Sequence, residues 1–334
     1  MIQVPRWSLL LAILALGSPA ASAADAKPAV PPADKPLYQF TEAEVGPYLD
    51  HLQATEPDLR KRVVHLARKN LGQPYELYLL GEMPFETYDP QPIYSLAKSD
   101  CLVFAEHTLA MALSRDWSGF MLLLQRIRYR DGQLGVATRN HFTETDWNPS
   151  NRWLVRDITG EIPGGRAVKF SERIDRSKFL LGRYHLQTSI PIEDHTDNYL
   201  PYAEIARAAP QLKDGDLINV VRGIVKPGVA VNDIFGGSAW IGHVGLVAHG
   251  VDGSLHIIHS SDPQVREETI EQFIARETAH NAERDAAGKP RLLGFKFLQL
   301  EADPLANLRR LDGDNFPHVT LPGGALLGGK AAGF

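Results

Sequence analysis

The sequence of 334 residues predicts an α+β fold in which helices pack on an antiparallel sheet. Helix-forming segments dominate the first third of the chain, whereas residues 216–300 are typical of strands separated by Gly-rich loops. Helices that precede strands, rather than alternate with them, are typical of this fold class. No linker-like stretch divides residues 41–302, so we expect one domain there, with an insertion over about residues 115–212.

The first helices are marked by local start and stop signals. Thr41 and Glu44 form a capping box, in which each side chain pairs with a backbone N–H of the first turn. Pro57 divides the helical region that follows, and the second piece is expected over residues 58–70. Residues 102–113 are apolar nearly all round, which is typical of a buried helix.

The later part of the chain predicts strands and one further helix. Apolar runs with β-branched residues, bounded by Gly and Asp, indicate the strands. We expect strands at 217–222, 241–248, 255–260 and 292–300, and a helix at 267–285.

The N-terminus has the features of a secretory signal peptide over residues 1–23. Arg6 is followed by a short apolar run, and the segment ends in Ala-Ser-Ala, a small-residue cleavage site. The apolar run is too short to span a bilayer as a helix. We therefore expect an exported, periplasmic protein with no membrane anchor after cleavage.

Two flanking segments are expected outside the domain. Residues 24–40 are rich in Pro and Ala and predict a flexible linker. Residues 303–334 form a C-terminal extension whose Gly-rich tail is expected to be weakly ordered. The net charge of −5 gives no electrostatic reason to expect a nucleic-acid partner.

Cys101 is the only cysteine, so no disulfide can form within the chain. A lone thiol in an oxidising compartment is either buried and inert or reactive. Cys101 falls in the first turn of the predicted buried helix, with Ser99 or Asp100 as its N-cap. Free backbone N–H groups and the helix dipole favour an anion there, can lower the thiol pKa and can bind an oxyanion. This position favours a nucleophilic cysteine.

Four of the twelve histidines lie on the hairpin formed by the second and third predicted strands, and two of them, His243 and His259, are candidate catalytic residues. A two-residue loop would put His243 and His259 on opposite faces, whereas a three-residue loop over 251–253 puts them diagonally adjacent on one face. Three-residue loops that end in Gly are favoured, so we expect the second arrangement. His243 is then the candidate base for Cys101, and His259 orients its ring. The alternative for His259 is a hydrogen-bonded core histidine.

Three motifs carry a family resemblance: SDCLVFAE at 99–106, GHVGLV at 242–247 and HIIHSS at 256–261. In that order they resemble the NlpC-type papain-like cysteine peptidases of bacterial cell walls. Within these, the chain is most similar to the N-acetylmuramoyl-L-alanine amidase-like branch. The resemblance implies a papain-like NlpC-type fold, in which a central buried helix that carries the nucleophile packs on an antiparallel sheet.

The same resemblance implies roles for individual residues. Cys101 is the implied nucleophile, His243 the base and His259 the third, orienting residue. Tyr75, in the supporting stretch LGQPYELYLLGE, resembles a tyrosine that lines the site and contacts substrate. The branch often has small hydroxyl residues after the cysteine, whereas this chain has Leu102 and Val103.

Four residues of the inserted segment are candidates for substrate binding: Arg139, His141, Asp146 and Trp147. A Trp ring can stack on a sugar face, and Arg can pair with a carboxylate, which suits a sugar-peptide substrate. The alternative is a structural salt bridge beneath a loop. Glu106 is expected to point away from Cys101, because five residues turn the helix by about 140°.

The sequence thus predicts a secreted cysteine hydrolase whose partner is peptidoglycan or a muropeptide, and most specifically an N-acetylmuramoyl-L-alanine amidase. Three alternatives remain at this point: a stem-peptide endopeptidase that cuts after γ-D-glutamate, a transferase, and a non-catalytic cell-wall binding module. The chain has no metal-binding or phosphate-binding motif, so no cofactor is expected.

Overall fold

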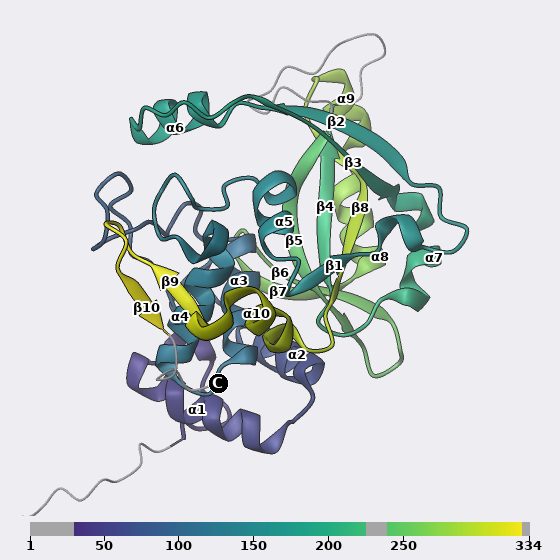
Figure 1. Ribbon diagram of the computed structural model, residues 1–334. Helices are drawn as coiled ribbons and strands as arrows, with labels where there is room; N and C mark the ends of the chain where they lie inside the picture. Colours follow the sequence, from purple (N-terminus) through teal and green to yellow (C-terminus); the bar gives the residue numbers. More distant parts are fainter. Residues whose placement is uncertain (1–29, 225–238, 329–334) are drawn as a thin grey trace, which may run out of the picture.

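A computed structural model describes residues 30–224 and 239–328 (Figure 1). The predicted signal peptide lies outside the described residues. Within the described ranges, no helix combines the length and the apolar character needed to cross a bilayer.

Four helices build one layer of the molecule: α1 (Glu42–Thr55), α2 (Leu59–Lys69), α3 (Cys101–Leu113) and α4 (Trp117–Arg128). The capping box of Thr41 and Glu44 starts α1, and Asp58 caps α2, so the predicted break at Pro57 is confirmed. Every residue of α3 from Val103 to Leu113 is buried, which confirms the predicted buried helix.

The other layer is an eight-stranded antiparallel sheet with the order β2-β3-β8-β4-β5-β6-β7, in which β1 pairs with β8 as well. Its strands are β1 (Val155–Asp157), β2 (Val168–Ile174), β3 (Glu193–Pro201), β4 (Leu217–Gly223), β5 (Ala239–His249), β6 (Leu255–Ser261), β7 (Gln264–Thr269) and β8 (Arg291–Leu300). The four strands predicted from the sequence correspond to β4, β5, β6 and β8.

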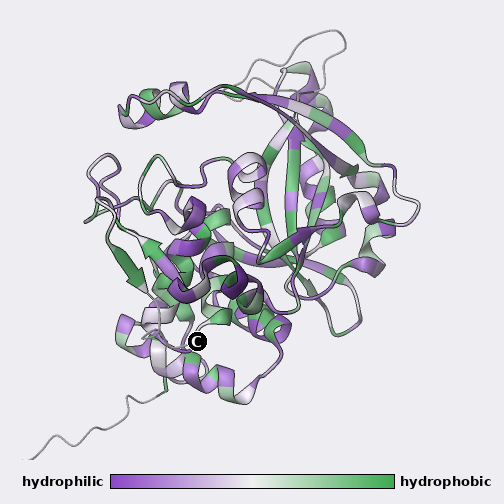
Figure 2. Cartoon of the chain, viewed as in Figure 1, coloured by the Kyte–Doolittle hydropathy of each residue, from purple (hydrophilic) through white to green (hydrophobic). Residues whose placement is uncertain are grey.

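Helices cover both faces of the sheet. One core joins the helical layer to one face of the sheet, with Phe104 and Leu109 of α3 packed in the same cluster as Val244 and Leu246 of β5. The opposite face of the sheet packs against Phe273 of α8 (Ile270–Thr278). Hydrophobic residues accordingly concentrate on α3 and on the inner strands (Figure 2).

The segment expected as an insertion contributes to the same sheet. Its strand β3 pairs with β8, and β2 pairs with β3. Between them, α6 (Arg176–Tyr184) sits at the tip of an arm that projects from the sheet (Figure 1). We call residues 168–201 the arm. Short helices complete this segment: α5 (Asn148–Ser150) and α7 (Ile205–Ala208).

The predicted helix at 267–285 is wrong in its first residues. Residues 264–269 form β7, because a tight turn at Asp262-Pro263 pairs Gln264 back with Ser261 of β6. Thr269 then caps α8 with its side chain, and a second short helix, α9 (Asn281–Ala286), follows.

Both flanking segments are partly integrated into the domain. Leu37 and Phe40, at the end of the expected linker, are buried in the helical core. The C-terminal extension forms α10 (Pro304–Asp312), β9 (His318–Thr320) and β10 (Leu326–Gly328), and Val319 of β9 is fully buried. The expected weakly ordered tail therefore includes a paired strand, and residues 329–334 lie outside the described range.

Candidate active site

Cys101 is the first residue of α3 and lies where this buried helix reaches the surface. The Asp100 carboxylate caps the helix by accepting a hydrogen bond from the backbone N–H of Val103 at 2.8 Å. Cys101 and Leu102 remain half-buried, in contrast to the residues from Val103 to Leu113. The backbone of Cys101 is therefore fixed by a buried helix, while its side chain remains partly exposed.

The two candidate histidines lie side by side on the β5–β6 hairpin. The N–H of Gly250 donates to the carbonyl of Ser254 at 2.9 Å, which confirms the three-residue loop. His243 Nε2 and His259 Nδ1 are consequently 2.8 Å apart, and the two rings are nearly perpendicular. Gly245 lies opposite His259, and a Cβ there would approach Ile257 Cγ1 to 2.5 Å, so only glycine leaves room for this packing.

A third group extends the histidine pair. His259 Nε2 lies 2.8 Å from the carboxylate of Glu268 on β7, and Arg276 of α8 donates to the same carboxylate at 2.7 Å. Burial opposes ionisation of Glu268, but the hydrogen bonds from His259 and Arg276 outweigh it and lower its pKa to about 2. Glu268 is therefore a carboxylate at neutral pH.

The ionised Glu268 sets the protonation of both rings. A carboxylate only accepts, so His259 must carry its proton on Nε2 and leave Nδ1 as an acceptor. His243 then donates from Nε2 to His259 Nδ1, which leaves the lone pair of His243 on Nδ1. We call this chain of His243, His259 and Glu268 the relay.

The thiol lies close to the strand that carries His243. The backbone N–H of Val244, the residue after His243, faces the sulfur of Cys101, as do N–H groups at the start of α3. α3 packs directly against β5 and β6. Cys101 and the relay therefore meet at one edge of the helix–sheet interface.

The expected lowering of the thiol pKa is not found. Burial raises the pKa of Cys101 to about 12, and the negative charge of Asp100 adds to this shift. The surrounding N–H groups act in the opposite direction but are outweighed. Burial also holds the pKa of His243 well below its ordinary value, with neighbouring His259 as a further cause. The resting pair is therefore a neutral thiol and a neutral imidazole.

Tyr75 lies beside Cys101. The backbone of Tyr75 lies between those of Pro263 and Ser99. Its N–H donates to the carbonyl of Pro263 at 3.0 Å, and it forms an isolated β-bridge with Ser99. Burial raises the pKa of the Tyr75 hydroxyl, and the next largest cause is the negative charge that Cys101 carries when it is deprotonated. This proximity places Tyr75 where it can contact a group bound at the thiol.

Buried hydroxyl groups tie the start of α3 to the strand of His259. Ser260 Oγ donates to the carbonyl of Ser99 at 2.9 Å. Ser99 Oγ in turn donates to Gln73 Oε1 at 2.7 Å. The segment that precedes Cys101 is thus hydrogen-bonded directly to the strand that carries His259.

A cavity of about 220 Å³ opens next to the start of α3, lined by the chain neighbours of Cys101. Asp100, Leu102 and Val103 of the α3 start line one side, and Phe179, Arg183 and Tyr184 of α6 line another. The Arg183 guanidinium lies 3.8 Å from the ring centroid of Tyr78, so the tip of the arm closes onto the loop that precedes α3. The rest of the lining comes from the segment 78–89, from Glu106 of α3, from Arg128 of α4 and from residues 139–142.

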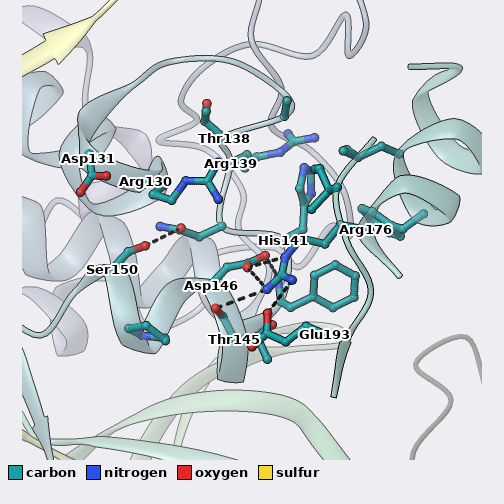
Figure 3. A pocket seen from close by; sticks show the side chains of 17 residues that line it. Arg130, Asp131, Thr138, Arg139, His141, Thr145, Asp146, Ser150, Arg176 and Glu193 are labelled. Atoms are coloured by element: carbon teal, nitrogen blue, oxygen red, sulfur yellow. Dashed lines mark hydrogen bonds and ion pairs between the residues drawn. The ribbon is translucent and has the colours of Figure 1, made fainter. Parts of the chain in front are cut away.

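A second cavity, of about 380 Å³, shares the 139–142 segment as a wall. Three of the predicted substrate-binding residues, Arg139, His141 and Asp146, line it (Figure 3). The structure therefore brings these three together, although no residue next to Cys101 in the chain lines this larger cavity.

Each of the three already has partners within the protein. Arg139 pairs with Asp89 at 2.9 Å and with Glu82 at 3.4 Å. Asp146 pairs with Arg176 of α6 at 2.6 Å. His141 Nε2 lies 2.6 Å from the carbonyl of Val136, and burial lowers the pKa of His141 to about 3. Arg139 and Asp146 therefore fit the alternative to substrate binding, in which these residues form structural salt bridges.

Trp147 cannot bind substrate as predicted. It is fully buried, and its indole N–H donates to Glu106 Oε1 at 3.0 Å. Glu106 also pairs with Arg128 at 2.9 Å. The turn at 143–147 points the ring into the helical core, so no sugar can stack on it. Glu106 therefore anchors this neighbouring segment, and it also lines the cavity of about 220 Å³.

Sequence reasoning missed Glu268 and the α6 residues. The predicted helix at 267–285 includes Glu268, yet the Asp262-Pro263 turn is a signal for a further hairpin, and on β7 Glu268 is diagonal to His259. Nothing in the local pattern of residues 176–184 indicated that α6 would reach the start of α3.

Comparisons with known proteins bear on this arrangement. Residues 65–279 match the family model AmiA-like, described as N-acetylmuramoyl-L-alanine amidase-like. The match spans more than half of the chain and includes Cys101, His243, His259 and Glu268. No curated protein matches the chain in sequence.

Two solved structures resemble the fold. A protein from Legionella pneumophila, of family DUF1460, aligns with a TM-score of 0.64 at 20% identity, covering 78% of this chain and 94% of the other. An N-acetylmuramoyl-L-alanine amidase from Bacteroides uniformis aligns with a TM-score of 0.53 at 22% identity, covering 73% of this chain and 99% of the other. At this identity the likeness concerns the fold.

Proposed function

The chain belongs to the N-acetylmuramoyl-L-alanine amidase-like family, and from this premise we propose that it is a cysteine amidase of peptidoglycan. The bond we propose is the amide between N-acetylmuramic acid and the L-alanine of the stem peptide. The fold we propose is papain-like and NlpC-type, with α3 as the helix that carries the nucleophile. The proposed site of action is the periplasm, in keeping with the predicted signal peptide.

One observation carries the catalytic part of the proposal. The relay of His243, His259 and Glu268 ends at the strand that faces the thiol at the start of α3. A nucleophile needs a base, and the base needs a group that fixes its tautomer and orientation. The relay supplies both, since Glu268 directs the lone pair of His243 to Nδ1.

The protonation states determine how the reaction starts. Because the thiol and the imidazole are both neutral at rest, His243 Nδ1 takes the proton from Cys101 as the sulfur attacks the amide carbonyl. The negative charge passes to the carbonyl oxygen, and the N–H groups at the start of α3 and of Val244, which lie near the sulfur, are the proposed donors that stabilise it.

The intermediate then collapses to a thioester. His243 returns the proton to the leaving amine, which departs as the N-terminus of the stem peptide, and the muramoyl lactyl group stays on Cys101 Sγ. Water, deprotonated by His243, attacks the thioester and regenerates the thiol. The cavity of about 220 Å³ beside Asp100 and Leu102 is the proposed place for one side of the scissile bond.

Mass spectrometry of muropeptides incubated with the protein tests this proposal, with Cys101→Ser as the matched control. Stem peptides that begin with L-alanine, absent with the variant, are the expected products. Cuts within the stem, also absent with the variant, would replace the amidase by a stem-peptide endopeptidase. No products, together with a thiol inert to iodoacetamide, would overturn the enzyme and leave a binding module.

A further inference from the structure

A third cavity, of about 330 Å³, lies between α4, the loop at 83–93 and the C-terminal hairpin of β9 and β10. It shares no lining residue with the two cavities near the candidate active site. No charged residue lines it: the lining residues are Phe85, Ile93, Ser118, Met121, Leu122, Gln125, Leu134, Val319, Leu327 and Gly328. Its volume falls within the range of roughly 300–1,000 Å³ that is typical of small-molecule sites.

One face of α4 runs along this cavity from the surface inwards. Ser118, Met121, Leu122 and Gln125 are spaced by three and four residues, so their side chains lie on the same side of the helix. Ser118 is exposed, whereas Leu122 is 9% and Gln125 4% exposed. Gln125 is thus a buried polar residue in a cavity whose other lining side chains, apart from exposed Ser118, are apolar.

The amide of Gln125 has no partner for either of its polar atoms. Both Nε2 and Oε1 are buried and make no hydrogen bond within the part of the chain that the structure describes. Buried side-chain amides are nearly always hydrogen-bonded, because an unpaired donor or acceptor loses its water without compensation. An apolar cavity that ends in an unpaired donor and acceptor indicates a ligand that supplies the complementary pair.

We propose that this cavity binds a small uncharged molecule with an apolar body and one primary carboxamide or lactam group. Such a group presents an N–H and a C=O on the same edge, so it can form two parallel hydrogen bonds with Gln125. A trans secondary amide presents them on opposite edges. A carboxylate or an ammonium would enter without an opposite charge among the lining residues, and this is unfavourable.

Ligand-observed NMR with the full chain tests the site. The probes are hexanamide, 3-phenylpropanamide and caprolactam, with hexanoate, hexylammonium and N-methylhexanamide as matched controls. We expect the three probes to bind at least about tenfold more tightly than the controls, which corresponds to one or two hydrogen bonds. No binding of the probes up to their solubility limit would overturn the proposal.

Two variants assign the binding to this cavity. Gln125→Met keeps the length of the side chain but removes the amide, and it should abolish the preference for hexanamide over N-methylhexanamide. Met121→Trp should fill the cavity and abolish binding of all probes. Wild-type binding in both variants would overturn the assignment. Cys101→Ser should bind the probes as the wild type does, so the result is independent of the proposed hydrolysis.

Discussion

The relay and the cavity of about 220 Å³ both lie near the start of α3 but are built in different ways. The relay comes from two successive hairpins, and its donors and acceptors lie on neighbouring strands. The cavity takes its walls from segments as distant as Tyr78, Asn140 and Arg183, held by ion pairs and ring contacts such as that of Arg183 with Tyr78. The geometry of the relay, proposed for catalysis, therefore depends on local strand register. The shape of the cavity, proposed for substrate binding, depends on long-range packing.

The largest expected effect comes from removing the base of the relay. His243→Gln should lower peptidoglycan cleavage by roughly 10³-fold, because the proposed acceptor of the thiol proton is lost. The measurement is the rate of stem-peptide release at constant protein concentration. His256→Gln is the matched control, because His256 lies on the same hairpin but pairs with Glu267. Equal rates for the two variants would contradict the assignment of His243.

A smaller effect is expected at the far end of the relay. Glu268→Gln should lower the rate by roughly 10- to 100-fold with little change in KM, because the rings lose the charge that fixes their tautomers. Glu267→Gln, which alters the neighbouring carboxylate that pairs with Arg68, is the control. A rate that changes only in parallel with thermal stability would indicate a purely structural role.

Glu268 also makes a prediction for acid stability. Its pKa falls from the ordinary 4.5 to about 2 in the folded protein, so the unfolded chain binds this proton more readily. Its stabilising contribution is complete above pH 4.5 and is lost as the pH falls towards 2. Denaturation at several pH values in this window should show a shallower loss of stability for Glu268→Gln than for the wild type. An unchanged slope would contradict the lowered pKa.

The smallest effect is expected at the arm. Arg183→Ala removes a contact with the Tyr78 ring that is worth about 0.5–1 kcal/mol at an exposed site. If the arm tip shapes the cavity, KM should rise a few-fold while kcat stays unchanged. Arg173→Ala, on the same arm but paired with exposed Asp194, should leave both constants unchanged. The same KM and kcat for the two variants would contradict a role of the arm tip in substrate binding.

The sequence by itself determined the elements whose causes are local. The capping residues Thr41 and Asp58, the apolar run after Cys101 and the Gly-terminated loop at 251–253 each act within a few residues, and the structure bears out these elements. The adjacency of His243 and His259 follows from strand register alone, because side chains alternate between faces with a period of two.

Only the tertiary structure decided what depends on distant partners. The sequence does not distinguish a Trp ring that packs in a core from one that stacks on a sugar. The position of Trp147 depends on its hydrogen bond with Glu106, about 40 residues away in the chain. The thiol pKa was set by burial, which outweighs the helix N–H groups once α3 is covered by the sheet. The reach of α6 to Tyr78 depends on how β2 and β3 extend from the sheet, and no local pattern encodes that direction.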